Sequence, residues 1–305
     1  MRSKKDLVND TYEKHKCSKA KIIKMVGIVA SSYYKEPSLG KKGNAPTLTT
    51  FHQTKGFVEQ PVVANSIKKI LKNEFIDCGY RLMTSYLKRD GYTLNHKKLY
   101  RIMKEEGLLK LENRINRSGS GRKFVKFRKV YTSRPMQCLE MDIKMVWVPS
   151  VGKNAYLLSI IDVHTRRILK DYFSFTIKQN HVIDLLSQLF EEYQYPENVV
   201  IRSDNGSQFI AKSVREYLGL IGVQQEFTHV ATPEENAHIE AYHGILKKEV
   251  FARFDYRTFG EIQQILKRFV NFYNNIRLHG LLGRITPMEK WNSDKHLIMM
   301  KKLTA

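Results

Sequence analysis

Three acidic residues stand in sequence contexts where carboxylates could do chemistry together. Asp204 follows an apolar, strand-like run and precedes the turn-forming pair Asn205 and Gly206, which predicts a carboxylate at the end of a strand. Asp142 lies in the middle of another strand-like run. Glu240 follows Asp204 after thirty-five intervening residues, in a segment with helical spacing. Three carboxylates in a basic chain indicate metal ions and a phosphodiester substrate.

Transfer of a phosphodiester requires an activated oxygen nucleophile and neutralisation of charge on the attacking and leaving oxygens. Two divalent ions about 3.5–4 Å apart supply both, and carboxylates are the ligands that such ions prefer. Our hypothesis is that Asp142 bridges both ions, with Asp204 on one and Glu240 on the other. Spacing alone has little force in a chain with 30 acidic residues. Asp142 is harder to dismiss, because a half-buried acid in a strand is costly without a partner.

The helical spacing around Glu240 divides its segment into two faces. At about 100° per residue, Asn236, His243 and Lys247 share the face of Glu240. The expected core stripe is a third of a turn away and consists of Ile239, Tyr242, Leu246 and Val250. Glu240 is therefore expected to face a cleft, and Asn236, His243 and Lys247 are candidate DNA contacts. Glu249 points elsewhere and is a poor candidate.

Composition bounds the class of protein. The chain has 305 residues, enough for two domains, with 42% hydrophobic and 27% charged residues, as in ordinary globular proteins. No apolar run approaches the roughly 18 residues needed to span a bilayer. The start of the chain lacks the apolar core of a secretion signal. Three scattered cysteines form no disulfide or zinc pattern, which favours a reducing, cytoplasmic location.

Charge is distributed unevenly along the chain. The formal net charge is +22. Residues 1–130 carry 30 Lys and Arg against 11 Asp and Glu, a net of +19, whereas the remaining residues carry 22 and 19, a net of +3. This asymmetry indicates an amino-terminal half that meets a polyanion, and nucleic acid is favoured over a membrane surface.

Patterning divides the chain into five regions. These are a basic helical segment with a linker (1–60), a helix-turn-helix domain (61–111), a basic flexible linker (112–131), a catalytic core (132–292) and a carboxyl-terminal tail (293–305). Within the first region, residues 36–60 are interpreted as the linker because of their Pro, Gly and Thr content. Arg122 and Lys123 of the basic linker are expected to follow DNA phosphates without reading sequence.

Three short helices are predicted between Pro61 and Leu111. The third begins after Asn95 and is expected to expose its basic residues, namely His96, Lys97, Lys98, Arg101 and Lys104. Three helices with a basic last one match the helix-turn-helix plan, in which that helix enters the major groove. A plain three-helix bundle with a solvated basic face fits the same pattern, and charge alone does not choose between them.

After residue 135 the pattern changes to strands alternating with helices. Strands are predicted at 138–148, 154–162, 167–175, 198–203 and 222–227, and helices at 178–193, 207–219, 233–252 and 258–278. Such an order indicates a mixed sheet in an α/β domain. Asp162, at the end of the second strand, is interpreted as a turn or support residue.

Five blocks of this sequence, in order, resemble the OrfB-type transposases of the insertion sequence 3 family, which have a DDE core of the retroviral integrase type. The blocks are Cys78–Leu108, Ile160–Ile168, Ser203–Phe209, Asn236–Glu249 and Tyr273–Pro287. The resemblance covers nearly the whole chain. It departs from the family at Lys144, where Thr or a similar residue is common, and at Glu234–Glu235, where Asp-Asn is commoner before Asn236.

The resemblance implies a ribonuclease H-like core with a mixed five-stranded sheet, an all-α helix-turn-helix region, and two Mg²⁺ ions, or Mn²⁺ in their place. It implies Asp142, Asp204 and Glu240 as the catalytic, metal-binding triad, with Lys247 contacting DNA. The implied reaction is cleavage at the ends of an element by water, followed by attack of a 3′-hydroxyl on a new phosphodiester. The implied partners are double-stranded DNA, further copies of the chain on that DNA, and a protein from an upstream reading frame.

Two other functions remain open at this point. A plain ribonuclease H-type nuclease would keep the metal site without needing the basic amino-terminal module. A DNA-binding regulator, domesticated from such an enzyme, would keep the fold without the chemistry.

Overall fold

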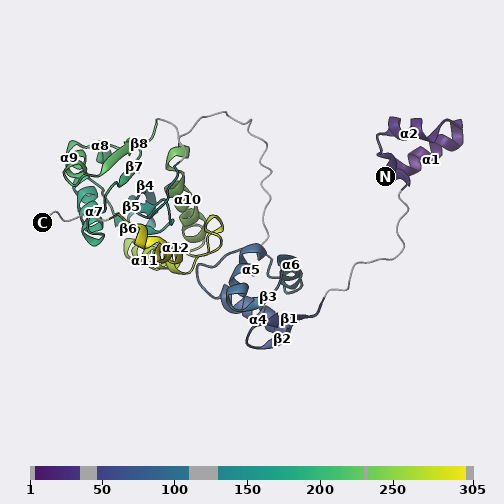
Figure 1. Cartoon of the computed structure of the whole chain (residues 1–305), viewed down its shortest axis with the longest axis horizontal. Helices are drawn as coiled ribbons and strands as arrows, with labels where there is room; N and C mark the ends of the chain where they lie inside the picture. The colour runs from purple at the N-terminus through teal and green to yellow at the C-terminus, as the bar shows by residue number, and fades with distance from the viewer. Residues whose placement is uncertain (1–3, 35–46, 110–129, 230–232, 300–305) are drawn as a thin grey trace. The chain divides into compact units, whose positions relative to one another are not determined.

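The computed structural model describes residues 4–34, 47–109, 130–229 and 233–299 (Figure 1). The chain divides into two units, Met1–Thr47 and Leu48–Ala305, each with its own hydrophobic core. Within the described ranges, no helix is long and apolar enough to cross a membrane.

The amino-terminal unit is helical, as the sequence indicated. It contains α1 (Lys4–His15), α2 (Lys19–Val26) and α3 (Ala30–Tyr34). Val8 of α1 packs with Ile22 and Ile23 of α2 in a small core. Gly27 ends α2 in the left-handed conformation, with φ +67°, which glycine adopts without steric cost.

The second unit begins with a helix-turn-helix region that also contains a small sheet. Its elements are β1 (Thr49–His52), β2 (Gly56–Glu59), α4 (Gln60–Leu71), α5 (Tyr80–Arg89), β3 (Tyr92–Thr93) and α6 (His96–Glu105). The three predicted helices are confirmed. Asn95 caps α6, as predicted, by accepting a hydrogen bond from the Lys98 amide at 2.8 Å.

The interpretation of residues 36–60 as a linker was wrong for its last part. Strands β1 and β2 form an antiparallel hairpin, and β3 pairs with the other edge of β1, in the order β2-β1-β3. Phe51 and Phe57 face each other across the hairpin with ring centroids 5.5 Å apart. Each strand has four residues or fewer, too few for alternation to be recognised against the turn-rich background.

Lys98 is not exposed on α6, contrary to prediction. It is 9% exposed, and its ammonium group donates a hydrogen bond to the carbonyl oxygen of Thr49 on β1. The sequence suggested no strand beside α6, so nothing indicated that this face of the helix would be covered. Lys98 therefore ties α6 to the small sheet.

A mixed five-stranded sheet forms the centre of the remaining region, as predicted. Its strands are β4 (Cys138–Val148), β5 (Lys153–Asp162), β6 (Ile168–Ser174), β7 (Val200–Ser203) and β8 (Gln224–Phe227). They lie in the order β6-β5-β4-β7-β8. β4, β5 and β6 pair antiparallel, whereas β7 runs parallel to both β4 and β8.

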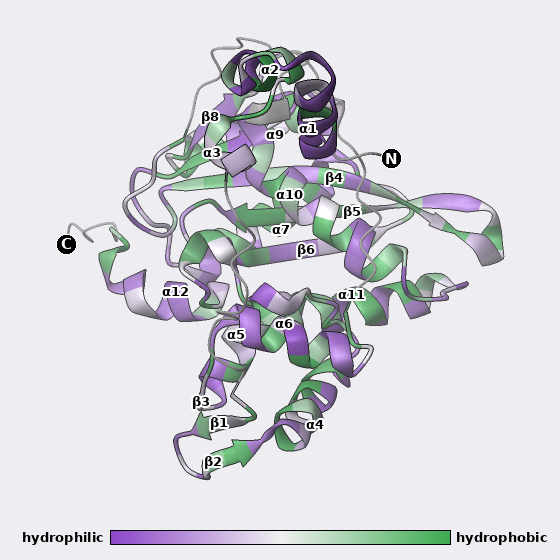
Figure 2. Ribbon diagram, turned by 90° about the vertical axis from the view of Figure 1, so that its right-hand side faces the viewer, coloured by the Kyte–Doolittle hydropathy of each residue, from purple (hydrophilic) through white to green (hydrophobic). Residues whose placement is uncertain are grey.

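Helices cover both faces of this sheet. The helices are α7 (Gln179–Glu192), α8 (Ser207–Ile210), α9 (Lys212–Leu220), α10 (Ala237–Leu246), α11 (Phe259–Asn275) and α12 (Pro287–Asp294). Ala211 separates α8 from α9 where one helix was predicted, and a π-helical segment, Lys247–Phe251, continues α10. Hydrophobic and hydrophilic residues alternate along the helices, and the hydrophobic stripes supply the cores (Figure 2).

The two faces of β4 differ in what they contact. Leu139 and Met141 belong to a core built with α7, α9 and α12. Because side chains alternate along a strand, Glu140 and Asp142 point to the opposite face. There Val146 and Val148 join the core built with α10 and α11. This alternation turns Asp142 toward α10.

The predicted carboxyl-terminal tail is packed, at least up to residue 299. The 3₁₀ helix Lys295–Leu297 follows α12, and Ile298 packs against the core that contains Trp291. The Glu197 amide donates a hydrogen bond to the carbonyl oxygen of Met299 at 2.8 Å.

The helix-turn-helix region and the sheet region share one hydrophobic core within the second unit. Phe75, which follows α4, lies 5.2 Å from Phe269 and 5.3 Å from Phe272 of α11, measured between ring centroids. Glu74 accepts hydrogen bonds from Arg268 of α11 at 2.8 and 3.2 Å. Two regions that the sequence separates are therefore in direct contact.

Asp162 is a support residue, as interpreted from the sequence. It is fully buried at the end of β5, and its carboxylate accepts hydrogen bonds from the Met136 amide at 2.9 Å and the Thr165 amide at 2.8 Å. The Thr165 hydroxyl donates a third at 2.6 Å. Burial raises the pKa of Asp162, and these hydrogen bonds oppose that shift. The carboxylate thus holds the β5–β6 turn against the start of β4.

We expect Asp162→Ala to lower the free energy of unfolding by about 2–3 kcal/mol, because it leaves buried donors without an acceptor. Asp184→Ala, at an exposed position of α7, is the matched control and should change it by less than about 0.5 kcal/mol. Urea unfolding followed by circular dichroism measures both. Equal midpoints for the two variants would contradict the support role.

Candidate active site

The register of two parallel strands places Asp142 and Asp204 at the same level of the sheet. Cα partners between β4 and β7 include Glu140 with Arg202. Asp142 lies two residues beyond Glu140, and Asp204 lies two residues beyond Arg202. Asp142 on β4 and Asp204 directly after the end of β7 lie at the same distance past a paired position, which places them side by side across the strand direction.

Asp142 is half-buried, and both of its carboxylate oxygens have a polar group nearby. One carboxylate oxygen accepts a hydrogen bond from the Ile143 amide at 2.8 Å. The other lies 3.2 Å from Nδ1 of His243, on α10. A helix residue therefore reaches the strand acid directly and holds its orientation.

Asp204 is exposed in the turn after β7, where local geometry fixes it. Its Oδ1 accepts a hydrogen bond from the Gly206 amide at 3.0 Å. A Cβ at Gly206 would lie 2.6 Å from Nε2 of Gln208, at the end of a flexible side chain, and 3.0 Å from this carboxylate oxygen, so the glycine lets these two side chains approach the turn closely. Asn205 ties the turn to the end of β8 through a 2.9 Å bond to the carbonyl oxygen of Thr228.

Glu240 is exposed on the first turn of α10, and a buried carboxylate fixes where that helix begins. Glu140, with no exposed surface, accepts hydrogen bonds at 2.9 Å from the amides of His238 and Ile239. Its second oxygen lies 2.6 Å from Nδ1 of His238. A carboxylate at the first amides of a helix satisfies donors that have no partner within the helix, and it complements the helix dipole.

Arg202 fixes the approach to α10 from the neighbouring strand. Its guanidinium donates a 2.9 Å bond to the carbonyl oxygen of Glu235 and a 2.8 Å bond to the carboxylate of Glu226 on β8. Together, Glu140 and Arg202 attach the start of α10 to β4 and β7, the two strands that carry or precede the other acids.

Sequence reasoning did not identify Glu140 as a functional residue. A signal was present, because Glu140 lies two residues before Asp142 and therefore on the same face of a strand. A second acid at such a position needs buried donors, and the first amides of a helix are the usual source.

The three carboxylates come from adjacent elements but do not close around one point. Within the described ranges, no three His, Cys, Asp or Glu residues are grouped so that they could hold a metal ion as they stand. The predicted convergence is therefore incomplete here: Asp142 is turned toward His243, and neighbouring carboxylates repel one another. The donor chemistry still suits Mg²⁺, since all three side chains offer carboxylate oxygens.

His243 and Asn236 do not lie on an exposed surface of the free chain, and their expected contacts with DNA stay predictions. His243 is 7% exposed and faces Asp142, and Asn236 is 5% exposed and donates a 3.4 Å bond to the carbonyl oxygen of Met141. Both share the side of α10 that carries Glu240, as predicted, but β4 covers these two residues while Glu240 stays exposed. Helical spacing identified the face without identifying what packs on it.

Two lysines lie close enough to interact electrostatically, and one of them, Lys144, also interacts with Asp142. Lys247 is exposed, as predicted for a DNA contact. Lys144, two residues after Asp142 on the same face of β4, has its pKa lowered by burial and then by the charge of Lys247, while Asp142 opposes the shift. Lys144 thus adds a cation near Asp142.

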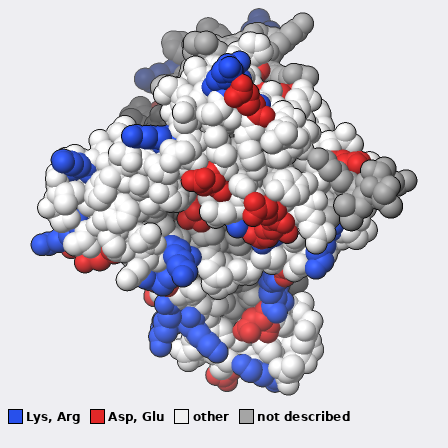
Figure 3. Space-filling view, turned by 90° about the vertical axis from the view of Figure 1, so that its left-hand side faces the viewer, with Lys and Arg blue, Asp and Glu red and all other residues white. Residues whose placement is uncertain are grey.

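Most of the predicted DNA contacts in the helix-turn-helix region are accessible. His96, Lys97 and Lys104 are exposed, and Arg101 is half-buried. Lys and Arg side chains spread over the lower part of the face in Figure 3, and acidic side chains gather near its middle. Arg122 and Lys123 lie outside the described residues.

Comparison with protein families finds matches in both regions of the second unit. Two models of the integrase core domain match residues 132–233 and 221–287. A model of an HTH-like domain matches residues 59–114. The integrase matches contain Asp142, Asp204 and Glu240, and the HTH-like match contains α4, α5 and α6.

Curated relatives come from bacterial insertion sequences. InsK of insertion sequence element IS150 from Escherichia coli (strain K12) is 25% identical over 275 residues, covering 85% of this chain and 94% of that protein. The transposase for insertion sequence element IS904 from Lactococcus lactis subsp. lactis (strain IL1403) is 24% identical over 246 residues, covering 77% and 96%.

Solved structures that resemble the chain include retroviral proteins. The catalytic core domain of BIV integrase is 16% identical and covers 53% of this chain and 97% of that chain, with a TM-score of 0.41. The HTLV-2 integrase catalytic core domain in complex with magnesium is 12% identical and covers 51% and 96%, with a TM-score of 0.39.

We expect Glu140→Gln to lower the rate of any reaction at this site by about 10- to 100-fold, because small displacements of a reacting group have effects of that size. Glutamine presents an NH₂ group where a carboxylate oxygen accepts a hydrogen bond, so the start of α10 should loosen. Hydrogen exchange of peptides covering 237–246 should accelerate while exchange in α7 stays unchanged.

The matched control for that experiment is Glu216→Gln, which alters an exposed helical acid on α9. It should leave both the rate and the exchange unchanged. Full activity of Glu140→Gln together with normal exchange in α10 would show that this carboxylate does not position Glu240.

Proposed function

We propose that this chain, which belongs to the insertion sequence 3 family of OrfB-type transposases, cleaves and joins DNA strands at Asp142, Asp204 and Glu240. It is a DDE transposase that mobilises an insertion sequence, with a ribonuclease H-like core and an HTH-like domain. The observation that carries the residue assignment is the placement of three acids on β4, on the turn after β7 and on α10. These elements are joined by the buried contacts of Glu140 and Arg202.

An integrase-type core indicates dependence on divalent metal ions. We infer two Mg²⁺ ions, or Mn²⁺ in their place, held by the carboxylates of Asp142, Asp204 and Glu240. When bound, they supply activation of an attacking oxygen and neutralisation of the leaving oxygen. Asp142, on the central strand β4, would contribute a carboxylate to both positions.

The remaining side chains orient and hold the reactants. His243 keeps one Asp142 oxygen in a fixed direction through its 3.2 Å contact. Lys144 and Lys247 offset the repulsion between a DNA phosphate and the carboxylates. In the first reaction the site aligns water with the phosphodiester at the element end. In the second it aligns the released 3′-hydroxyl with a phosphodiester of the target.

The proposed partner is double-stranded DNA, as element end and as target. Helix α6 would enter the major groove, with His96, Lys97, Arg101 and Lys104 near bases or phosphates. We further propose that copies of the chain assemble on paired ends, that an upstream-frame protein takes part, and that the protein works in the cytoplasm on the nucleoid.

The decisive experiment is a Mg²⁺-dependent cleavage and joining assay on a duplex that carries the terminal sequence of the element. Glu240→Gln should lower both reactions by at least about 10³-fold while DNA binding persists, because it removes one charge from the proposed metal ligands. Asp255→Asn, at an exposed acid after α10, is the matched control and should keep full activity.

The possible results separate the alternatives. Cleavage without joining would favour a plain nuclease, and binding without either reaction would favour a regulator or a missing upstream partner. Equal activity of Glu240→Gln and wild type would reject the role of Glu240.

A further inference from the structure

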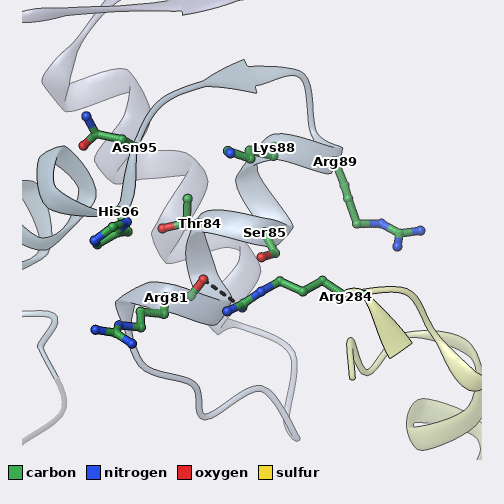
Figure 4. Close-up of a pocket in the computed structure, with 9 residues that line it drawn as sticks. Arg81, Thr84, Ser85, Lys88, Arg89, Asn95, His96 and Arg284 are labelled. Carbon is green, nitrogen blue, oxygen red and sulfur yellow. Dashed lines mark hydrogen bonds between the residues drawn. The ribbon is translucent and has the colours of Figure 1, made fainter. Parts of the chain in front are cut away.

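A cavity of about 650 Å³ lies between the helix-turn-helix region and a turn near the carboxyl end of the second unit (Figure 4). Its lining includes five basic residues and no acidic residue; the basic residues are Arg81, Lys88 and Arg89 of α5, His96 at the start of α6, and Arg284. Ser85 adds a hydroxyl group. Basic groups from three separate segments therefore surround one open space.

Most of these charges have no acid beside them. Among the described residues, Arg81, Lys88 and Arg284 form no ion pair. Arg89 differs, since its guanidinium pairs with the carboxylate of Glu289. A group of cations that the protein does not neutralise itself is a site for an anion from outside.

Arg284 is held in place by the backbone. Its guanidinium donates a 3.1 Å bond to the carbonyl oxygen of Arg81, drawn as a dashed line in Figure 4. Arg284 has φ +66° directly after Gly283 at φ +74°, and its amide bonds the His279 carbonyl oxygen at 2.8 Å. A left-handed arginine is uncommon and persists where the surrounding structure requires it. The turn thus presents this side chain to α5.

The shape of the site favours an extended anion over a small one. The cavity is open to solvent along α5, where Arg81, Ser85 and Lys88 follow one another at helical spacing. In a helix-turn-helix the first helix of the pair crosses the DNA backbone while the second enters the groove. Here α5 is the first helix of the pair and α6 is the second.

We propose that this cavity binds the sugar–phosphate backbone of duplex DNA, so that Arg284 of the core and Arg81 and Lys88 of the helix-turn-helix contact the same strand. The proposal deepens the proposed function and rests on it. It assigns a sequence-independent contact to a turn of the catalytic region. Recognition of the element end by α6 and retention of that DNA by the core would then depend on one shared site.

Salt dependence provides the test, because each phosphate contact contributes about 0.9 to the slope of log affinity against log salt. Removing Arg284 or Lys88 should each reduce the magnitude of that slope by about 1 and lower affinity about 5- to 10-fold near 0.1 M salt. We choose Arg284→Asn because asparagine tolerates the left-handed conformation that alanine does not. Lys88→Gln tests the helix side.

The measurement uses the full chain carrying Glu240→Gln, so that binding is measured without cleavage. Fluorescence anisotropy follows two probes over a salt series, a 30-base-pair duplex of random sequence and one carrying the terminal sequence of the element. Arg284→Asn and Lys88→Gln should each weaken binding to the two duplexes by the same factor. Lys153→Gln, an exposed lysine at the start of β5, is the charge-matched control and should leave the slope unchanged.

Two further variants keep the result decisive. Arg284→Lys should retain most of the slope, which a folding defect would not explain. Arg101→Gln on α6 should instead reduce the preference for the element sequence. Unchanged slopes for both Arg284→Asn and Lys88→Gln would overturn the proposal. If the slopes change as expected but the protein that retains Glu240 does not cleave DNA, the proposed function is rejected while the proposal that the cavity binds DNA stands.

Discussion

The buried carboxylate of Glu140 is the interaction on which the active site depends most. Burying an ionised acid away from water costs several kcal/mol unless donors replace its hydration. Here the amides of His238 and Ile239 replace it, and these amides belong to the first turn of the helix that carries Glu240. The contact satisfies both sides, because first-turn amides have no partner within their own helix. Glu140 therefore sets where α10 begins on the sheet, and with it which residues face Asp142.

Several parts of the site follow once α10 is fixed. His243 comes one turn after Glu240 and reaches Asp142, and Tyr242 and Leu246 enter the core beside it. The same helix thus supplies one acid, one side chain that orients another acid, and the packing that keeps both in place. Arg202 holds the residues just before α10 in place by donating a hydrogen bond to the carbonyl oxygen of Glu235. Strand register sets the positions of Asp142 and Asp204 along the sheet, whereas the position of Glu240 depends on these side-chain contacts.

Residue periodicity could predict the five-stranded sheet, the long helices and the elements that carry the three acids, because these segments are long enough to show their period. It could not predict the strands at 49–59, which are too short, and so it placed Lys98 on the surface. It identified the face of α10 but not the strand that covers it, which is why His243 and Asn236 were expected at DNA. Glu140 was missed for the same reason, since its donors are ninety-eight residues away in the chain. Residue periodicity within a segment does not predict which distant segments pack against it.

Charge placement then explains why so basic a chain can use an acidic site. Three carboxylates repel a DNA phosphate, and the cost grows as water leaves the contact. Lys144 lies close enough to Asp142 for their charges to interact, and Lys247 interacts with Lys144 in turn, although burial is the main cause of the lowered pKa of Lys144. More distant cations act differently, because screening limits them to about 8–10 Å at physiological salt. They must hold the duplex by touching its phosphates, which requires basic residues along the whole path of the DNA. Exposed basic residues of α5 and α6 can meet that requirement in the helix-turn-helix region, and Lys144 adds a cation near Asp142.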